Sequence, residues 1–542
     1  MTSKSPVRFK VFLWALIVAF GALFVFAQGD LSGYWVFKIP RGDGTFALSY
    51  FELKQSGDTI TGNTVGGRGQ TPISDGSFRD GKLHFAVSFT GRGGQKKGGT
   101  PQTFTTTYEG TLQGDKFALT MTGGRGGRGG RGPVTGDFER SKAEAAMPPA
   151  KLPLPALHDV RDNKLARTPP MGWNSWNKFA GTINDKDVRE MADAMVSSGM
   201  KKAGYLYVNI DDTWELGRDA KGNITTNTKF PNMKALADYV HSKGLKIGIY
   251  SGPGPTTCAG YEGSYGHEEQ DAKTYASWGI DYLKYDWCSA STIYTDEDMQ
   301  AVYQKMGDAL LKSGRPILYS LCQYGRAKVW EWGAKVGGNA WRTTGDINDS
   351  WQSLDRIGFG TAVPGGIRQQ GEPAPPGLTQ YDIAKGATIG HWNDPDMLEI
   401  GNGHMTTDEY RTHFSLWCLL RAPLLAGNDL RDMTEDTKSI LMNTDVIAID
   451  QDPAGLPLNR VKEDATTVVY SRPLKGGDIA VAMFNRGDQP AEMSVTWDSL
   501  GVAGKKLQAR DLWKHAAVPV SGDKYTASVP THGVVLLRVT AK

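Results

Sequence analysis

The chain is poor in the side chains that bind transition metals. It has nine histidines and four cysteines among 542 residues, with neither an H-E-x-x-H motif nor closely spaced histidines. Transition-metal sites draw on His and Cys, so none is expected. A Mg²⁺ site built only from aspartates is left open. However, phosphate chemistry would normally bring a glycine-rich loop to a helix start, and none is evident. We therefore expect no metal and no cofactor.

Neither sign of charge is in excess. Lysine and arginine number 61 against 58 aspartates and glutamates, a net charge of +3. This balance indicates an uncharged partner rather than nucleic acid or an anionic membrane. Three Arg-Gly-rich turns, around Arg68, from Arg92 to Lys97 and from Gly123 to Gly132, would suggest RNA contact in an intracellular protein. Behind an export signal, flexible loops are the favoured interpretation.

Long hydrophobic runs are confined to the N-terminus. Lys4, Arg8 and Lys10 precede an apolar run from Val11 to Ala27. This basic, apolar, small-residue order predicts a signal peptide over residues 1–27, cleaved after Ala27. The alternative is an uncleaved membrane anchor, because about 17 apolar residues is near the lower limit for spanning. Either predicts export, to the periplasm, the cell surface or the medium, where disulfides can form.

The length of the chain predicts several domains. Residues 30–140 show short alternating segments, such as 33–37, 51–53, 83–87 and 117–120, separated by glycines, which predicts a small antiparallel barrel or sandwich. A Pro- and Ala-rich stretch over 141–163 indicates a linker. Residues 457–542 are valine-rich with even spacing, which predicts a β-sandwich packed on the domain before it.

Between them, residues 164–456 alternate strand-like and helix-like stretches, the rhythm of βα units. Eight strands are predicted, which matches a (β/α)8 TIM barrel with its active site at the carboxyl ends of the strands. The predicted strands are 171–173, 205–211, 246–250, 282–286, 317–320, 340–342, 388–391 and 423–425. The predicted helices are 185–203, 233–243, 268–278, 296–313 and 407–420.

Charged residues follow several of these strands. One aspartate after a strand is usually a helix cap or a turn residue, but several on consecutive connections indicate a site. Such a carboxylate cluster either binds a divalent metal or catalyses glycoside hydrolysis. Lys284 lies two positions before Asp286, so both side chains face the same way, and its ammonium would keep Asp286 ionised. The charged residues are Asp211, Asp212, Lys284, Asp286, Arg342, Asp346, Asp394 and Asp396.

At these residues the chain resembles glycoside hydrolase family 27, the melibiase or α-galactosidase family. The resemblance covers about residues 165–452, and the last domain resembles the β-sandwich of that family. The motifs that carry it, in order, are RTPPMGWNSWNKF, GYLYVNIDDTW, GLKIGIYSGPGPTTC, HEEQDAKTYASWGIDYLKYDWC, YSLCQYG, WRTTGDI, HWNDPDMLEIGNG and RAPLLAGNDLR.

The resemblance implies a retaining exo-glycosidase that releases terminal α-D-galactose through a covalent glycosyl-aspartate. Asp286 would be the nucleophile and Asp346 the general acid/base. Asp394 and Asp396 would organise the mouth of the barrel. The family's disulfide implies that Cys258 pairs with Cys288, and Cys322 and Cys418 are expected to be unpaired. The implied substrate-binding residues are Trp176, Asp211, Asp212, Tyr250, Lys284, Gln323, Tyr324 and Arg342.

The chain also departs from the family. Gln323 and Tyr324 stand where several relatives have Glu and Trp, and residues 359–389 do not follow the usual loop. The alternatives are therefore the same mechanism acting on α-N-acetylgalactosaminides or β-L-arabinopyranosides. Asp212, shorter than Glu, leaves room for C6 of galactose and favours galactosides. A non-enzymatic alternative is a carbohydrate-binding surface protein that acts through residues 30–140.

Overall fold

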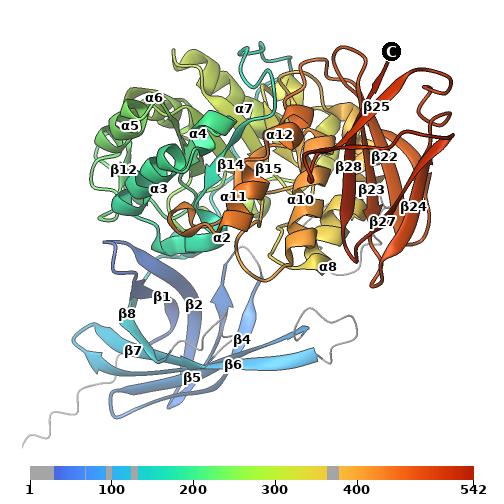
Figure 1. Ribbon diagram of the computed structural model, residues 1–542. Helices are drawn as coiled ribbons and strands as arrows, with labels where there is room; N and C mark the ends of the chain where they lie inside the picture. Colours follow the sequence, from blue (N-terminus) through green and yellow to red (C-terminus); the bar gives the residue numbers. More distant parts are fainter. Residues whose placement is uncertain (1–29, 67–68, 93–100, 124–131, 363–377) are drawn as a thin grey trace, which may run out of the picture. The chain divides into compact units, whose positions relative to one another are not determined.

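The computed structural model describes residues 30–66, 69–92, 101–123, 132–362 and 378–542 (Figure 1). The predicted signal peptide, most of the Arg-Gly turns and much of the divergent segment 359–389 lie outside these ranges. The chain forms two compact units, described separately below. The first comprises most of the N-terminal β-domain; the second comprises residues 141–542 together with 36–50 and 65–70.

The N-terminal β-domain is a closed barrel of eight strands in sequence order. Adjacent strands from β3 to β8 pair antiparallel. Aromatic side chains fill its interior; the rings of Phe85 and Tyr108, for example, stack 4.8 Å apart. The strands are β1 (Gly33–Pro40), β2 (Phe46–Ser56), β3 (Thr59–Val65), β4 (Thr71–Arg79), β5 (Lys82–Arg92), β6 (Pro101–Gln113), β7 (Lys116–Gly123) and β8 (Val134–Arg140). Of the two predicted alternatives, the barrel is the one observed.

The predicted linker contains one four-residue helix, α1 (Ala143–Ala146). After it, eight parallel strands form a single curled sheet in the order β19-β16-β15-β14-β13-β10-β9-β20. An isolated parallel bridge between Leu398, which follows β19, and Ala426 of β20 joins the two ends of this order. The strands are β9 (Met171–Asn174), β10 (Tyr207–Asn209), β13 (Lys246–Ser251), β14 (Tyr282–Asp286), β15 (Leu318–Cys322), β16 (Ala340–Arg342), β19 (Trp392–Asp394) and β20 (Leu424–Ala426).

Helices lie between these strands and pack against the sheet through buried apolar faces. The main helices are α3 (Asp185–Ser197), α5 (Met233–Ser242), α6 (Glu268–Trp278), α7 (Met299–Lys312), α10 (Thr407–Leu420), α11 (Glu435–Leu441) and α12 (Thr444–Asp450). Shorter helical segments are α2 (Trp176–Phe179), α4 (Met200–Ala203), α8 (Trp351–Leu354) and α9 (Gln380–Ile383). A hairpin of β11 (Glu215–Arg218) and β12 (Ile224–Thr226) follows β10.

Two predicted elements are displaced or divided in the structure, and the strand predicted at 205–211 is shortened to β10. The seventh strand was expected at 388–391, but Thr388 and His391 exchange two backbone hydrogen bonds across a tight turn, and β19 begins at Trp392. Gly390 in that turn has a φ of +93°, which glycine adopts readily. The single helix expected over 185–203 is divided into α3 and α4, because Gly199 is left-handed with a φ of +96°.

The C-terminal domain is a β-sandwich, as predicted. Its larger sheet has the order β21-β22-β23-β28-β25-β26, and β24 and β27 form the second sheet. Apolar residues of both sheets, including Val481, Leu537 and Val495, form a common core. The strands are β21 (Asn459–Glu463), β22 (Thr467–Pro473), β23 (Ile479–Asn485), β24 (Ala491–Thr496), β25 (Leu507–Asp511), β26 (Ala516–Val518), β27 (Lys524–Val529) and β28 (Val534–Ala541).

The sandwich packs directly on helix α10. Arg472, fully buried, donates hydrogen bonds to the carbonyls of Cys418 and Leu419 at the end of that helix. The Thr412 hydroxyl donates to the carbonyl of His532, and the Trp513 indole donates to the Ser415 hydroxyl. The sandwich therefore adds hydrogen-bond donors to backbone carbonyls in the last turn of α10, where a helix uses its acceptors least.

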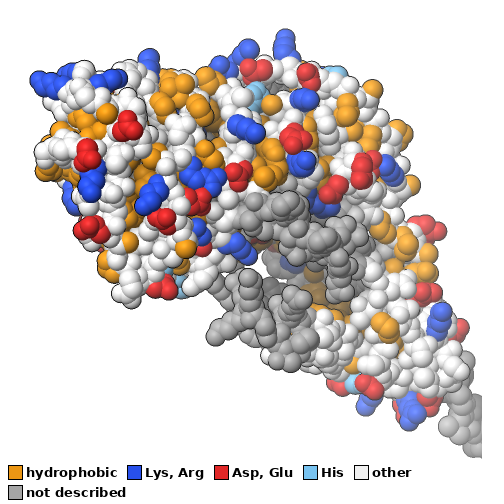
Figure 2. Space-filling view, turned by 90° about the vertical axis from the view of Figure 1, so that its right-hand side faces the viewer, with side chains coloured by type: hydrophobic (Ala, Val, Ile, Leu, Met, Phe, Trp, Pro, Cys, Tyr) orange, Lys and Arg blue, Asp and Glu red, His pale blue; other side chains and the backbone are white. Residues whose placement is uncertain are grey.

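Basic and acidic side chains are interspersed on the face of the molecule that Figure 2 shows, in keeping with the near-zero net charge. None of the helices in the described ranges combines the length and the apolar character that a membrane crossing requires.

Candidate active site

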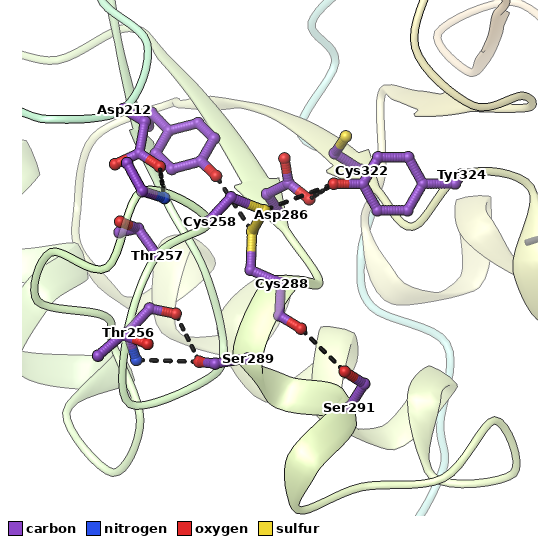
Figure 3. Close-up of a disulfide and its surroundings, with 12 residues drawn as sticks. Asp212, Thr256, Thr257, Cys258, Asp286, Cys288, Ser289, Ser291, Cys322 and Tyr324 are labelled. Carbon is purple, nitrogen blue, oxygen red and sulfur yellow. Dashed lines mark hydrogen bonds between the residues drawn. A yellow bond between two sulfur atoms is a disulfide. The ribbon is translucent and has the colours of Figure 1, made fainter. Parts of the chain in front are cut away.

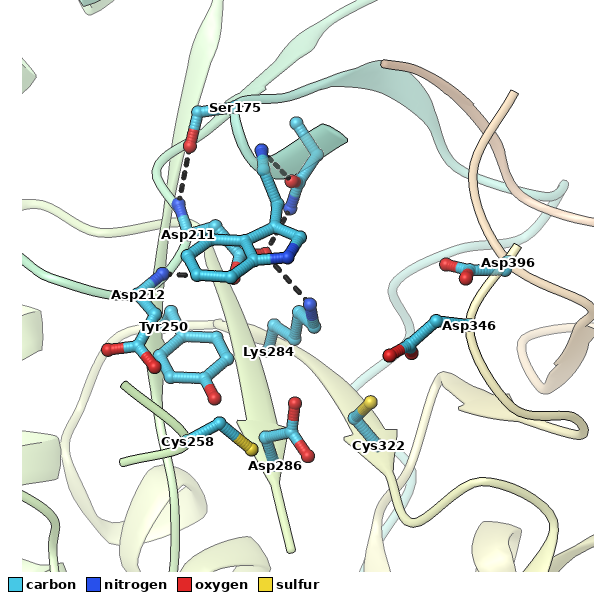
Figure 4. Close-up of polar contacts among 12 residues, drawn as sticks. Ser175, Asp211, Asp212, Tyr250, Cys258, Lys284, Asp286, Cys322, Asp346 and Asp396 are labelled. Carbon is cyan, nitrogen blue, oxygen red and sulfur yellow. Dashed lines mark hydrogen bonds and ion pairs between the residues drawn. The ribbon is translucent and has the colours of Figure 1, made fainter. Parts of the chain in front are cut away.

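Charged side chains from four strands of the curled sheet converge at its carboxyl end (Figure 4). Asp286 is the last residue of β14, and Arg342 is the last residue of β16. Asp211 and Asp212 follow β10, and Asp396 follows β19. Parallel strands end at the same edge of a sheet, so residues distant in sequence are brought together there. The convergence expected from the strand ends is therefore observed.

Asp211 and Asp212 are held almost completely buried, at 2 % and 1 % exposure. The backbone N–H of Asp211 donates to the Ser175 hydroxyl, and the Asn174 amide donates to Asp211 Oδ2. The backbone N–H of Ala259 donates to Asp212 Oδ2 at 2.8 Å. Burial raises the pKa of Asp212 to about 6, in spite of these hydrogen bonds.

Lys284 forms its ion pair with Asp211 rather than with Asp286, the carboxylate that we expected its charge to keep ionised. Its Nζ lies 2.8 Å from Asp211 Oδ2, and Figure 4 shows the ammonium group turned toward the Asp211 side of the site. Burial alone would lower the pKa of Lys284, but the negative charges around it, with that of Asp211 the largest, together outweigh burial and raise that pKa. The side chains of residues 284 and 286 do face the same way, yet the long lysine side chain reaches past β13 to the residue that follows β10. Its charge still lowers the pKa of Asp286 from a distance.

Asp286 is buried, at 5 % exposure, beneath the opening of the site. The Tyr324 hydroxyl donates a 2.6 Å hydrogen bond to its Oδ1. Burial raises the pKa of Asp286, while Lys284 and the Tyr324 hydrogen bond act in the opposite direction. Asp346 also raises this pKa, so the two carboxyl groups lie within electrostatic reach. Figure 4 shows both directed into the same open space.

Asp346 and Asp396 share the guanidinium of Arg342. Arg342 Nη2 lies 3.0 Å from Asp346 Oδ1 and 2.9 Å from Asp396 Oδ2. Asp396 is buried, whereas the Asp346 side chain is 76 % exposed in the open mouth. Partial desolvation by the surrounding protein would raise the pKa of Asp346, but the charge and hydrogen bond of Arg342 outweigh it and lower that pKa. The site thus places one buried and one exposed carboxyl group around the same space.

The predicted disulfide joins Cys258 and Cys288 beside Asp286 (Figure 3). It connects the loop after β13 to the turn after β14. The Tyr250 hydroxyl lies 3.3 Å from Cys288 Sγ, and the Tyr324 hydroxyl lies 3.6 Å from Cys258 Sγ. These two sulfurs and Asp286 also form a group close enough to hold a metal ion, but the sulfurs are bonded to each other. Cys322 and Cys418 are free and buried, as expected.

The remaining predicted binding residues are Tyr250, Trp176 and Gln323. Tyr250, at the end of β13, is buried with its hydroxyl near the disulfide (Figure 4). Trp176 begins helix α2, where its backbone N–H is held by the Asn174 side chain. Gln323 is completely buried, and its amide donates to the backbone carbonyl of Arg342. Gln323 therefore braces the strand that carries Arg342.

Two residues near the site were not singled out from the sequence, and a third, Cys322, was predicted only as an unpaired, buried cysteine. Asn174 and Ser175 hold Asp211, as described above, and both lie in the WNSWN stretch whose second tryptophan we had selected. Cys322, which we expected to be a buried small hydrophobe, lies opposite Asp286 in the pairing of β14 with β15. Its sulfur accepts a 3.7 Å contact from Arg342 Nη1. Their strand-end positions are the sequence signal that could have identified them.

Comparison with known proteins identifies close relatives of the chain. The family profile described as alpha galactosidase A matches residues 168–452, and that of the alpha galactosidase C-terminal beta sandwich domain matches 464–539. An alpha-galactosidase from Cyamopsis tetragonoloba is 46 % identical over 388 residues, covering 71 % of this chain and 89 % of the relative.

Two further relatives agree with these matches. Alpha-galactosidase A from Cellvibrio japonicus is 45 % identical over 392 residues, covering 70 % of this chain and 93 % of the relative. The crystal structure of alpha-galactosidase I from Mortierella vinacea superposes with a TM-score of 0.63 at 37 % identity, covering 70 % of this chain and 98 % of that structure.

Proposed function

The chain belongs to the alpha-galactosidase A family, and on that premise we propose that it hydrolyses terminal α-D-galactosides with retention of configuration. The observation that carries the proposal is the pair of carboxyl groups, Asp286 and Asp346, that face one space at the carboxyl end of the parallel sheet. We take this sheet to be a closed (β/α)8 barrel, with the bridge from Leu398 to Ala426 completing it.

In the first step, Asp286 attacks the anomeric carbon of galactose and forms a glycosyl ester. The bond to the leaving oxygen breaks, and that oxygen keeps the electron pair of the bond. It takes a proton from Asp346. In the second step, Asp346 takes a proton from water as the water attacks the same carbon. The bond to Asp286 then breaks and its electron pair returns to the carboxylate. The buried carboxylate suits the nucleophile, and the exposed one suits exchange of protons with water.

The low pKa that Arg342 gives Asp346 has a consequence for this cycle. A general acid must hold a proton when the substrate arrives. A substrate hydroxyl that takes over one Arg342 hydrogen bond would release Asp346 and allow its pKa to rise. We therefore expect Arg342 to act in two ways, by binding the sugar and by controlling the protonation of the acid.

Recognition of galactose falls to the buried carboxylate pair. Asp211 and Asp212 would accept hydrogen bonds from the 4- and 6-hydroxyls, and an axial 4-hydroxyl separates galactose from glucose. Because both carboxylates are buried, a sugar that leaves one of them unpaired loses on the order of 1–3 kcal/mol. Lys284, Arg342 and Tyr250 would bind the remaining hydroxyls, and the Trp176 ring would cover the apolar face of the sugar. Gln323 would contribute indirectly, by holding the backbone of Arg342 through its hydrogen bond to the Arg342 carbonyl.

The substrates would be galactose-containing oligosaccharides or polysaccharides. We further propose that the chain is exported, because a signal-like segment precedes a domain that contains a disulfide. The domain boundaries proposed from the sequence are kept: 30–140, 164–456 and 457–542, with the linker 141–163.

The test is a panel of p-nitrophenyl glycosides assayed with the full chain. The α-galactoside should be hydrolysed fastest, and the first product seen by NMR should be α-galactose. A preference for the β-L-arabinopyranoside or the α-N-acetylgalactosaminide would transfer the proposal to that sugar.

Two variants separate the roles of the carboxylates. Asp286→Asn should lose several orders of magnitude in turnover on every substrate. Asp346→Ala should lose most of its kcat/KM on galacto-oligosaccharides but much less on a dinitrophenyl galactoside, whose leaving group needs no proton, because kcat/KM reports formation of the ester and not the second step. Equal losses on both substrates would remove Asp346 as the acid. Asp349→Asn is the matched control, since Asp349 contacts Tyr410 and His404 instead.

A further inference from the structure

Tyr324 is fixed in an unusual backbone position two residues after the end of β15. Its φ is +62°, and Gly325 follows with a φ of +79°. A Cβ at Gly325 would lie 2.2 Å from the backbone oxygen of Thr343, so the chain cannot carry a side chain there without moving. The backbone N–H of Gly325 and the Gln323 amide both donate to the carbonyl of Arg342. These contacts hold a non-glycine residue in the left-handed region, which is often seen where a side chain has a functional orientation.

The Tyr324 side chain uses that orientation to reach the proposed nucleophile (Figure 3). Its hydroxyl donates to Asp286 Oδ1 at 2.6 Å, and its ring centre lies 5.7 Å from the Arg342 guanidinium. Asp286 Oδ2 accepts no hydrogen bond from any residue that the structure describes. The two oxygens of one carboxylate therefore differ: one is held by a phenol, and the other is free.

We propose that Tyr324 is a positioning residue that assigns these two oxygens separate roles, with Oδ2 as the attacking atom and Oδ1 as the atom that keeps the charge. The inference rests on the proposed function and adds to it. It concerns a position at which several relatives place tryptophan.

The proposal has a consequence for each chemical step. When Oδ2 bonds to the anomeric carbon, Oδ1 becomes the carbonyl oxygen of a neutral ester and its hydrogen bond from Tyr324 weakens. When that ester breaks, the electron pair returns to the carboxylate and the hydrogen bond strengthens again. A donor at Oδ1 therefore assists the departure of Asp286 more than its attack, because hydrogen bonds to charged groups are the stronger ones.

The decisive variant is Tyr324→Phe, which removes only the hydroxyl. With a dinitrophenyl galactoside, kcat should fall roughly tenfold to a hundredfold, the loss expected for a hydrogen bond to a charged group. At neutral pH, kcat/KM should change much less, since it reports formation of the ester. The glycosyl-enzyme should then accumulate, visible as a burst of one equivalent of phenol. In addition, the acidic limb of kcat/KM should move upward by about one pH unit, because the phenol no longer favours ionised Asp286.

A second substitution should shift the acidic limb of kcat/KM in the opposite direction while keeping the shape of the side chain. A 3-fluorotyrosine at position 324 is a stronger donor, so the acidic limb should move to lower pH. Tyr205→Phe is the matched control: Tyr205 is fully buried and its hydroxyl donates to the carbonyl of Leu441, outside the site. This control should leave both kcat and the pH limb unchanged.

Equal losses in kcat and kcat/KM for Tyr324→Phe, without a burst or a shift of the acidic limb, would overturn the proposal. An acidic limb that stays in place with 3-fluorotyrosine would overturn it as well. Either result leaves the proposed function intact, provided that the unmodified chain hydrolyses the galactoside. Failure of the unmodified chain on all α-galactosides would instead contradict the function itself.

Discussion

Lys284 Nζ lies 2.8 Å from Asp211 Oδ2, on the connection after β10 two strands away, although Asp286 is only two residues away along the same strand. Both partners are largely buried, with 17 % and 3 % of their side chains exposed. A buried ion pair of this kind holds the sugar-binding carboxylate in place and leaves the nucleophile to other partners. It also means that neither charge can be removed without leaving the other unpaired.

A double-mutant cycle on this pair should show strong coupling. Lys284→Met leaves the buried Asp211 carboxylate without its cation, which should destabilise the fold by about 3–5 kcal/mol. The variant Lys284→Met with Asp211→Asn should lose less stability than the two single losses added together, because the unpaired charge is gone. Urea unfolding followed by tryptophan fluorescence measures this, since both residues lie in the same domain. Additive losses would show that the pair is not coupled.

The pH dependence of stability should carry a contribution from Glu399. This buried residue accepts hydrogen bonds from Asn177 and Asn402, and burial raises its pKa to about 7 from an ordinary value of 4.5. The folded protein therefore keeps the proton that the unfolded chain releases between these pH values. The contribution of Glu399 is fully present below pH 4.5 and is lost as the pH rises through 7, a loss of roughly 3 kcal/mol.

Glu399→Gln removes that titration and offers a direct measurement. The melting temperature of the variant, relative to that of the unmodified chain, should rise between pH 5 and pH 8. Comparing the difference rather than the absolute value cancels other groups that titrate in the same range, such as Asp212 and Asp394, whose pKa values are about 6. A difference that does not vary with pH would mean that Glu399 is ionised in the folded protein.

Removal of the disulfide should affect both stability and turnover. Cys258 and Cys288 are 30 residues apart in sequence, and opening a loop of this size costs about 3 kcal/mol. The substitution of both cysteines by serine should also lower kcat, because the bridge contacts the hydroxyls of Tyr250 and Tyr324 next to Asp286. Cys418→Ser is the control for turnover, since this free cysteine lies on α10 away from the site. Full activity without the bridge would limit its role to stability.

The sequence predicted most of the elements that carry the site. The strand over 282–286 and the helices over 268–278 and 407–420 have the predicted bounds. Terminal signals mark both helices, since a capping box begins α10 at Thr406 and a left-handed Gly279 follows α6. At Gly199 and Gly390 the backbone changes direction, but the hydrophobic pattern continues on both sides, so the sequence did not show that an element ends there. Local pattern thus located elements but not turns within them.

Side-chain partners were harder to predict than strand ends. The alternation along β14 correctly placed Lys284 and Asp286 on one face, but the lysine is long enough to choose between two carboxylates. The choice depends on how Asn174 and Ser175 orient Asp211, which is a tertiary relationship. In the same way, the hydrogen bond from Tyr324 to Asp286 depends on the left-handed backbone at residue 324, for which a tyrosine in the sequence gives no signal.

The contact between Arg472 and the end of helix α10 bears on how this protein can be divided or recombined. Because the guanidinium is wholly enclosed and serves two carbonyls of the preceding domain, a shortened version ending near residue 456 would expose the apolar flank of α10 together with those carbonyls. The C-terminal domain is therefore needed for the stability of the domain that carries the site, and it is not an independent accessory domain. An exchange between homologues that respected this would transfer α10 and the sandwich as one block.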